Sequence, residues 1–200
     1  MSRHITFNDT HIYVESLSAD IEQIIQKCNK ETIEKINQAT SPRRKREIAM
    51  AHLLIKQLIG EHAQLCHNEI GAPYITNHDC FISITHSASH IALAINHNHP
   101  IGIDMENWRE QLISVKTKFL SEKEISLYSS PQQLLQAWTI KEALYKVAQT
   151  PGISLSNDII LPTNLKCNIA KVNTLAGLCD FTFHIIESSP EYCISLAQPF

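Results

Sequence analysis

Glycine is scarce in this chain of 200 residues: five glycines occur, and they are far apart in the sequence. A P-loop and a dinucleotide-binding turn both need closely spaced glycines, so both kinds of nucleotide site are excluded. If the protein binds phosphates, basic side chains and a metal ion must hold them. Aromatic residues make up only 6% of the chain, which also disfavours nucleic-acid binding by base stacking.

Long apolar runs and a strong charge of one sign are also missing. No stretch approaches the roughly 20 apolar residues that cross a bilayer, and the first residues lead into polar sequence rather than into a signal-peptide core. The formal net charge is −3, which favours neither nucleic acid nor an anionic membrane as a partner. We expect a cytoplasmic protein that binds neither nucleic acid nor membrane.

Cysteine and histidine give no clear metal-binding pattern. No two of the six cysteines have Cys-x-x-Cys spacing, and we interpret them as reduced, mostly buried residues. The eleven histidines raise the question of a metal site, above all at His97 and His99. Two histidines on a turn beside a proline are more typical of a surface, and we favour that interpretation.

Helical and strand patterns occur in mixed order in both halves of the chain, which predicts an α+β fold rather than an alternating βαβ fold. Ser41-Pro42 and Ser130-Pro131 each have the signature of a helix start, with serine as the N-cap and proline as the first helical residue. The expected helices span 19–38, 42–60, a short segment after Ser121, and 131–149. The expected strands span 10–17, 81–85, 91–95, 101–106, 165–172, 181–186 and 192–197.

Two carboxylates lie in the string Gly102-Ile103-Asp104-Met105-Glu106, which has the alternation of a strand. Side chains two residues apart on a strand share a face, so Asp104 and Glu106 are expected to point the same way, roughly 6.5–7 Å apart. Two such carboxylates repel each other unless a cation lies between them, and hard oxygen ligands suit magnesium. From the spacing alone, a solvated strand edge is the alternative.

A second group of chemical interest lies on the helix expected from residue 131. Offsets of three and four residues place Trp138, Glu142 and Tyr145 on one face of that helix. A carboxylate on an aromatic face is expected to be partly buried and to need a partner. Lys146 lies one turn beyond Glu142, so a plain surface ion pair between these two residues is the alternative.

Two further polar groups have open interpretations. Thr85-His86-Ser87 ends an expected strand, where it either faces an anionic ligand or forms a hydrogen-bonded turn. The basic run Arg43-Arg44-Lys45-Arg46 lies in the first turns of an expected helix, where the helix dipole is positive and cations are unfavourable. This run is therefore either solvated or placed to meet an anion.

Together and in this order, these motifs resemble those of the 4'-phosphopantetheinyl transferase family, and most closely its single-chain type that activates surfactin synthetase. The family pattern is a Ser-His-Ser turn, then Gly-Ile-Asp-x-Glu, then Trp-x-x-Lys-Glu-Ala-x-x-Lys. The resemblance covers roughly residues 40–150, and the segment 119–124 and the turn Gly71-Ala72-Pro73 also match in place. Two departures stand out: Thr85 replaces the first serine of the turn, and Ala72 stands where the family often has a lysine for a coenzyme A phosphate.

The resemblance implies two similar, pseudo-symmetric α+β halves in one chain, here residues 1–98 and 99–200, with the metal site in the second half. It implies a monomeric, magnesium-dependent enzyme of the holo-[acyl-carrier-protein] synthase type. Such an enzyme transfers 4'-phosphopantetheine from coenzyme A to a serine of an apo acyl or peptidyl carrier protein and releases adenosine 3',5'-bisphosphate. A non-catalytic carrier-binding module of the same fold is the runner-up, and another magnesium phosphohydrolase is a third candidate.

The same resemblance implies a role for each matching residue. The implied magnesium ligands are Asp104, Glu106 and Glu142, and the implied catalytic residues are Glu142, Lys146 and Glu124. The implied coenzyme A contacts are Thr85, His86, Ser87, Lys141, Lys146, Arg43 and Arg46. Which of Arg43, Arg44 and Arg46 offsets the missing lysine at Ala72 stays open. Glu124 stands where the family has its proposed general base, but Ser121-x-x-Glu124 is also a capping box, and both interpretations stay open.

Overall fold

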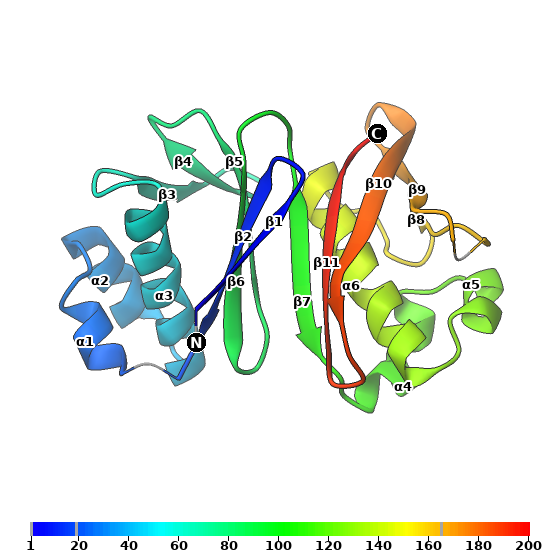
Figure 1. Ribbon diagram of the computed structural model, residues 1–200, viewed down its shortest axis with the longest axis horizontal. Helices are drawn as coiled ribbons and strands as arrows, with labels where there is room; N and C mark the ends of the chain where they lie inside the picture. Colours follow the sequence, from blue (N-terminus) through cyan, green and yellow to red (C-terminus); the bar gives the residue numbers. More distant parts are fainter. Residues whose placement is uncertain (1, 19, 165) are drawn as a thin grey trace.

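The computed structural model describes residues 2–18, 20–164 and 166–200. Two large antiparallel sheets lie face to face in the middle of the molecule, and helices cover the outer face of each sheet (Figure 1). This arrangement confirms the predicted α+β class. Within the residues described, no helix is both long enough and apolar enough to cross a membrane.

The first half of the chain forms a four-stranded sheet with the strand order β1-β2-β6-β5. Helix α3 packs against this sheet, and α1 and α2 pack against α3 on its far side (Figure 1). The bounds of these elements are β1 (Arg3–Phe7), β2 (Thr10–Ser16), α1 (Ile21–Ile25), α2 (Lys30–Gln38), α3 (Pro42–Leu58), β5 (Phe81–His86) and β6 (His90–Asn96).

The helices of this half begin at polar caps. Helix α3 starts where the sequence predicted, with the Ser41 hydroxyl accepting a hydrogen bond from Arg44 N at 3.1 Å. The single helix expected over 19–38 is instead two helices, because the Asn29 side chain accepts from Thr32 N at 2.9 Å and so starts α2 anew. Residue 19 of that expected helix lies outside the described residues.

A small hairpin of β3 (Gln64–His67) and β4 (Pro73–Thr76) follows α3 and was not predicted. Each strand has four residues, which is too short for an alternating pattern to be recognised. The strands are joined by a turn at 68–71, where Gly71 N donates to Asn68 O at 2.9 Å and Gly71 has a φ of +83° that few other residues adopt. The predicted turn at 71–73 thus lies slightly late, since Pro73 already belongs to β4.

The second half forms a five-stranded sheet with the order β7-β11-β10-β9-β8. Helix α6 lies along its outer face, and the shorter helices lie beside α6 (Figure 1). Residue 165 of the expected strand 165–172 lies outside the described residues, and the observed strand β9 begins at Ile169. The elements are β7 (Gly102–Asn107), α4 (Gln111–Val115), η1 (Lys116–Lys118), α5 (Glu122–Leu127), α6 (Pro131–Ala148), β8 (Ile159–Ile160), β9 (Ile169–Thr174), β10 (Gly177–Ser188) and β11 (Tyr192–Pro199).

Alternation along β6 explains how the two sheets pack so closely. Ile91, Leu93 and Ile95 belong to the core under α3, whereas Ala92 and Ala94 belong to the apolar cluster between the sheets. The large side chains therefore fill the helix side, and the small alanines allow the second sheet to approach.

Side-chain hydroxyls of β5 join the two halves along β7, which is the edge strand of the second sheet. Ser83 Oγ accepts from Ile103 N at 3.0 Å, and Thr85 Oγ1 accepts from Met105 N at 3.2 Å. These bonds satisfy two backbone donors that a β-ladder would otherwise take. The two sheets differ in strand number, so the similarity of the halves and their boundary at residue 98 stay predictions.

Candidate functional site

Gly102 lets α6 approach β7 unusually closely. A Cβ atom at this position would lie 2.0 Å from Ala143 O and 2.9 Å from Val147 N. Both are backbone atoms of α6, so a larger residue would force the helix away from the strand. The close approach brings Asp104, two residues along β7, to the charged face of α6.

Asp104 is held by both neighbouring elements. Its side chain is largely buried, and Oδ1 accepts from Lys146 Nζ at 2.8 Å and from Thr85 Oγ1 at 2.9 Å. Lys146 Nζ also donates to Ile103 O at 2.8 Å. Among the described residues, none donates a hydrogen bond to Asp104 Oδ2. The alternative of a solvated strand edge is therefore wrong for this residue.

Glu142 carries a half-buried carboxyl group. Burial, together with the negative charge of Asp104, raises the pKa of Glu142 to about 7; Lys146 opposes this rise and Glu106 adds to it. In the part of the chain that the structure describes, no hydrogen bond or ion pair reaches the Glu142 carboxylate. The alternative of a surface ion pair with Lys146 is therefore not observed.

Glu106 lies two residues beyond Asp104 on β7, and alternation along the strand puts both on the face opposite Ile103 and Met105, which pack between the two sheets. Its Oε2 lies 3.1 Å from Arg109 Nη2, and its Oε1 accepts from Asn107 N at 3.0 Å. Burial raises the pKa of Glu106, and Arg109 opposes that rise. Arg109 was not singled out in the sequence, although its offset of three residues allows the contact.

The three carboxylates lie near one another but do not form a finished metal site. Within residues 2–18, 20–164 and 166–200, no three His, Cys, Asp or Glu side chains converge as metal binding requires. Lys146 and Arg109 provide the compensating positive charge instead. The donor chemistry nevertheless fits magnesium, since Asp104 Oδ2 and the Glu142 carboxylate have no hydrogen-bond donor among the described residues and are hard oxygen ligands.

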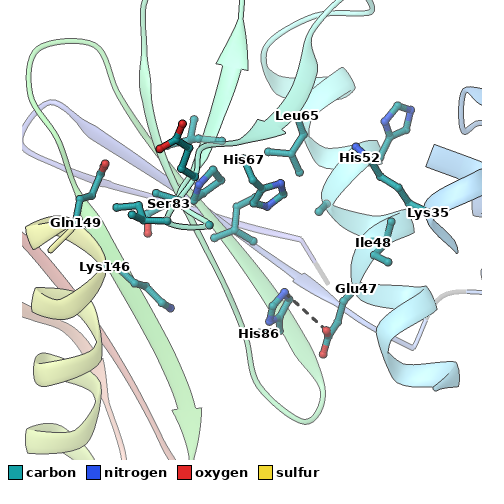
Figure 2. Close-up of a pocket in the computed structure, with 18 of the residues that line it drawn as sticks. Lys35, Glu47, Ile48, His52, Leu65, His67, Ser83, His86, Lys146 and Gln149 are labelled. Atoms are coloured by element: carbon teal, nitrogen blue, oxygen red, sulfur yellow. Dashed lines mark ion pairs between the residues drawn. The ribbon is translucent and has the colours of Figure 1, made fainter. Parts of the chain in front are cut away.

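A cavity of about 710 Å³ lies between the two halves and reaches Lys146. Its walls come from α2, α3, the β3–β4 hairpin, β5 and the C-terminal end of α6. Figure 2 shows Lys146 entering from α6 on one side and Glu47 from α3 on the other, with His86 between them. The volume is that of a typical small-molecule site, and apolar residues such as Ile48 and Leu65 line its middle.

Glu47 organises the basic groups at the α3 wall. Its oxygens lie 2.9 Å from Arg43 Nε, 3.2 Å from Arg44 Nη1 and 3.9 Å from His86 Nε2. Burial opposes ionisation of Glu47, but His86 and the arginines lower its pKa overall. Burial also lowers the pKa of His86, Glu47 opposes that shift, and Lys146 and the arginines add to it. Burial and the neighbouring cations thus disfavour the protonated form of His86.

The turn Thr85-His86-Ser87 divides between two faces of the molecule. His86 lines the cavity, whereas Thr85 and Ser87 are buried and do not. Ser87 Oγ accepts from Ser89 N at 3.4 Å and from His90 N at 3.3 Å, so the hydrogen-bonded turn is observed there. Side chains alternate along β5, so a strand that turns His86 to the cavity turns Thr85 to β7. The predicted coenzyme A contacts of Thr85 and Ser87 do not fit this arrangement.

Of the three arginines considered for the place of the missing lysine, Arg44 is the one that reaches the cavity. Arg44 lines the cavity together with Ile48 and Ala51, which share one helix face. Arg43 lies outside the lining and donates to Ser87 O at 3.3 Å, and Arg46 is exposed outside the lining. Arg44 and Ile48 are four residues apart, and this helical spacing indicates in the sequence that they share the face that forms this cavity wall.

Lys141 and Glu124 form a fully enclosed pair away from the cavity. Lys141 has no exposed surface, and its Nζ donates to Glu124 Oε2 at 2.7 Å, to Ile159 O at 2.7 Å and to Leu155 O at 2.9 Å. All three ammonium hydrogens are thus used within the protein. Burial lowers the pKa of Lys141, and Glu124 opposes that shift. A contact between Lys141 and a pyrophosphate does not fit this position.

Glu124 is saturated with hydrogen-bond donors. Oε2 accepts from Ser121 N at 2.8 Å and Ser121 Oγ at 2.9 Å in a capping box, in addition to Lys141, and Oε1 accepts from Leu161 N at 2.8 Å. Four donors occupy the acceptor sites of one carboxylate. The geometry favours the capping interpretation over the general base.

Several cavity residues had no sequence signal. Gln149 follows the end of α6, just beyond Tyr145 and Lys146 of the predicted site face, and no local pattern marked Gln149 itself. Lys35 and His67 come from α2 and from the unpredicted β3–β4 hairpin. Their placement depends on tertiary contacts between elements far apart in the chain.

Comparison with known proteins supports the family suggested by the motifs. Residues 100–197 match the model of the 4'-phosphopantetheinyl transferase superfamily. A stretch of 85 residues is 38% identical to the 4'-phosphopantetheinyl transferase gsp of Aneurinibacillus migulanus. That stretch covers 40% of this chain and 35% of the relative, so the chain aligns with about a third of the relative's length.

Proposed function

We propose that this chain, whose residues 100–197 match the 4'-phosphopantetheinyl transferase superfamily, transfers 4'-phosphopantetheine from coenzyme A to a carrier protein. In this reaction a serine oxygen of the apo carrier forms a new bond to the phosphorus that carries the pantetheine arm. The bond from that phosphorus to the bridging oxygen breaks, and adenosine 3',5'-bisphosphate leaves. The serine hydroxyl gives up its proton to solvent, and the leaving phosphate oxygen can take up one proton in return.

One observation carries the proposal: the cavity between the halves reaches Lys146, whose ammonium group is bound to Asp104 beside Glu142. A pyrophosphate in this cavity near Lys146 and His86 would place its reacting phosphorus next to the carboxylate group. Positioning and charge stabilisation account for most catalysis of phosphoryl transfer. Asp104 and Glu142 do not themselves line the cavity, so Lys146 is the proposed link between a bound pyrophosphate and the carboxylates.

Lys146 and His86 are the proposed contacts with the phosphates of coenzyme A. Lys146 carries a positive charge and, by releasing Ile103 O, can turn to a phosphate oxygen; it is also the proposed proton donor to the leaving group. Neutral His86 donates or accepts one hydrogen bond at the cavity wall. Arg44 supplies the positive charge on the α3 side, in the absence of a lysine at Ala72.

Asp104, Glu106 and Glu142 are the proposed holders of a magnesium ion. Bound there, magnesium would neutralise the charge that develops on the phosphate oxygens as the bond breaks. Binding requires the carboxylates to change rotamer, since they do not converge as they stand. Asp104 Oδ2 and Glu142 are the donors most ready to do so, because no described residue donates a hydrogen bond to them.

We propose an apo acyl or peptidyl carrier protein as the acceptor, which places the enzyme in the holo-[acyl-carrier-protein] synthase type. Both walls of the cavity come from one chain, so a monomer suffices to form the site. Incubation with coenzyme A, magnesium and a panel of apo carriers, followed by intact-protein mass spectrometry, tests the proposal. Gain of one phosphopantetheine mass on a carrier supports it; carrier binding without a mass change supports the non-catalytic module instead.

A further inference from the structure

The Thr85 hydroxyl lies between the two halves of the molecule and contacts the acidic strand twice. It donates to Asp104 Oδ1 at 2.9 Å and accepts from Met105 N at 3.2 Å. Thr85 is 3% exposed and does not line the cavity. Its hydrogen-bonding groups are therefore directed at β7 and not at a ligand.

The two oxygens of Asp104 have different environments. Oδ1 takes the bonds from Thr85 and Lys146, which come from opposite sides of the strand, β5 and α6. For Oδ2, no donor is present among the residues described. A carboxylate with one oxygen fixed in this way keeps its plane, and its second oxygen stays available at a constant position.

The two hydrogen bonds to Oδ1 also differ in whether they persist when a phosphate enters the cavity. Lys146 is 28% exposed and lines the cavity, so a phosphate that enters the cavity competes with Asp104 for its ammonium group. Thr85 is enclosed, and its hydroxyl orientation is fixed by the bond from Met105 N. Thr85 is the restraint that remains when Lys146 turns to an anion.

From this geometry we infer that Thr85 is a positioning residue: it fixes Asp104 through Oδ1 and so presents Oδ2 to a divalent cation. The role of such a cation in catalysis rests on the proposed function, whereas the test below measures cation binding alone. Hydrogen bonds to metal-ligating side chains commonly change metal affinity by about 10- to 100-fold when they are removed. Thr85 acts through Asp104 and does not itself touch the cation or the substrate.

The test is the binding of Mn²⁺ alone to the purified full chain, followed by electron paramagnetic resonance of the free ion. Thr85→Val keeps the shape of the side chain but removes the hydroxyl, and we expect its dissociation constant for Mn²⁺ to rise about 10- to 100-fold. Thr85→Ser keeps the hydroxyl and is expected to bind Mn²⁺ like the wild type. If the valine variant does not fold, Thr85→Ala takes its place.

Ser83→Ala is the matched control, because it removes the neighbouring hydroxyl bond from β5 to Ile103 N without touching a carboxylate. We expect it to lower the thermal midpoint as Thr85→Val does, with unchanged Mn²⁺ affinity. The inference would be overturned if Thr85→Val and Ser83→Ala bound Mn²⁺ with the same affinity, whether that affinity were unchanged or weakened in both. It would also be overturned if the wild type bound no Mn²⁺. A wild type that binds Mn²⁺ in this pattern but modifies no carrier would overturn the proposed function alone.

Discussion

Lys146 Nζ lies 2.8 Å from Asp104 Oδ1 on β7, and it makes no ion pair with Glu142, which lies one helical turn before it on α6. Lys146 and Asp104 are 42 residues apart in the chain, and their contact joins α6 to β7. Helix spacing would pair Glu142 with Lys146, but Glu142 is instead a half-buried acid whose pKa rises to about 7.

Replacing Lys146 with methionine tests the role of this cation. The variant loses the charge that compensates Asp104 and the proposed contact with the pyrophosphate, so we expect the kcat of transfer to fall by about 10²- to 10⁴-fold. The measurement is steady-state transfer to an apo carrier with saturating coenzyme A. Lys171 on β9 forms an exposed ion pair with Asp180 on β10. Lys171→Met is therefore the control and should retain activity. Similar rates in both variants would remove Lys146 from the chemistry.

Glu142→Gln should change the pH dependence of stability in the metal-free protein. The folded pKa of Glu142 lies above its unfolded value, so its contribution is present at acidic pH and is lost as the pH rises from 4.5 to about 7. The loss is on the order of 3 kcal/mol in the wild type and absent in the variant. Thermal midpoints measured with chelator should therefore favour the variant increasingly from about pH 5 to about pH 8. A constant difference across this range would contradict the raised pKa.

His86→Ala should weaken the use of coenzyme A more than it weakens folding. His86 lines the cavity, and its Nε2 lies 3.9 Å from Glu47 Oε2, beyond hydrogen-bond distance. Loss of a phosphate contact costs about 1–3 kcal/mol, so the KM for coenzyme A should rise roughly 5- to 150-fold. His62→Ala, at an exposed position outside the cavity lining, is the control. An unchanged KM in His86→Ala would count against the contact.

Lys141→Met should damage stability rather than substrate binding. Removing one partner of a buried ion pair leaves the Glu124 charge uncompensated and costs about 3–5 kcal/mol. Adding Glu124→Gln to this variant should restore part of the loss, which denaturant unfolding of the single and double variants measures. At a temperature where Lys141→Met is folded, its KM for coenzyme A should match the wild type. A stable variant with a raised KM would instead support the pyrophosphate contact expected from the motif.

Local patterns in the sequence predicted the elements that carry the site. Helix α6, strand β7 and the shared face of Asp104 and Glu106 all follow from periodicities of 3.6 and two residues, which are set by backbone geometry. The same rule of two applies to β5, where it turns Thr85 away from the side that His86 faces. The same alternation, applied to the motif Thr85-His86-Ser87, predicts that Thr85 and His86 face opposite sides of the strand.

Other parts of the site depend on tertiary packing and could not be predicted from local patterns. The partner of Lys146 is Asp104 because Gly102 lets α6 approach β7 at backbone contact distance. The enclosure of Lys141 depends on Ile159, which comes from a strand beyond the helix. Spacing along one element cannot reveal a partner that another element supplies.

The most direct test of the central claim is the intact mass of an apo carrier protein after incubation with coenzyme A and this chain. The account predicts that wild type with magnesium adds one phosphopantetheine group to a carrier serine. It also predicts that wild type with chelator, and Glu142→Gln with magnesium, add far less in the same time. The proposed activity would be contradicted if the carriers stayed unmodified under all conditions while a known transferase modified the same carriers in parallel. The carboxylate site would be contradicted if wild type and Glu142→Gln modified the carrier equally.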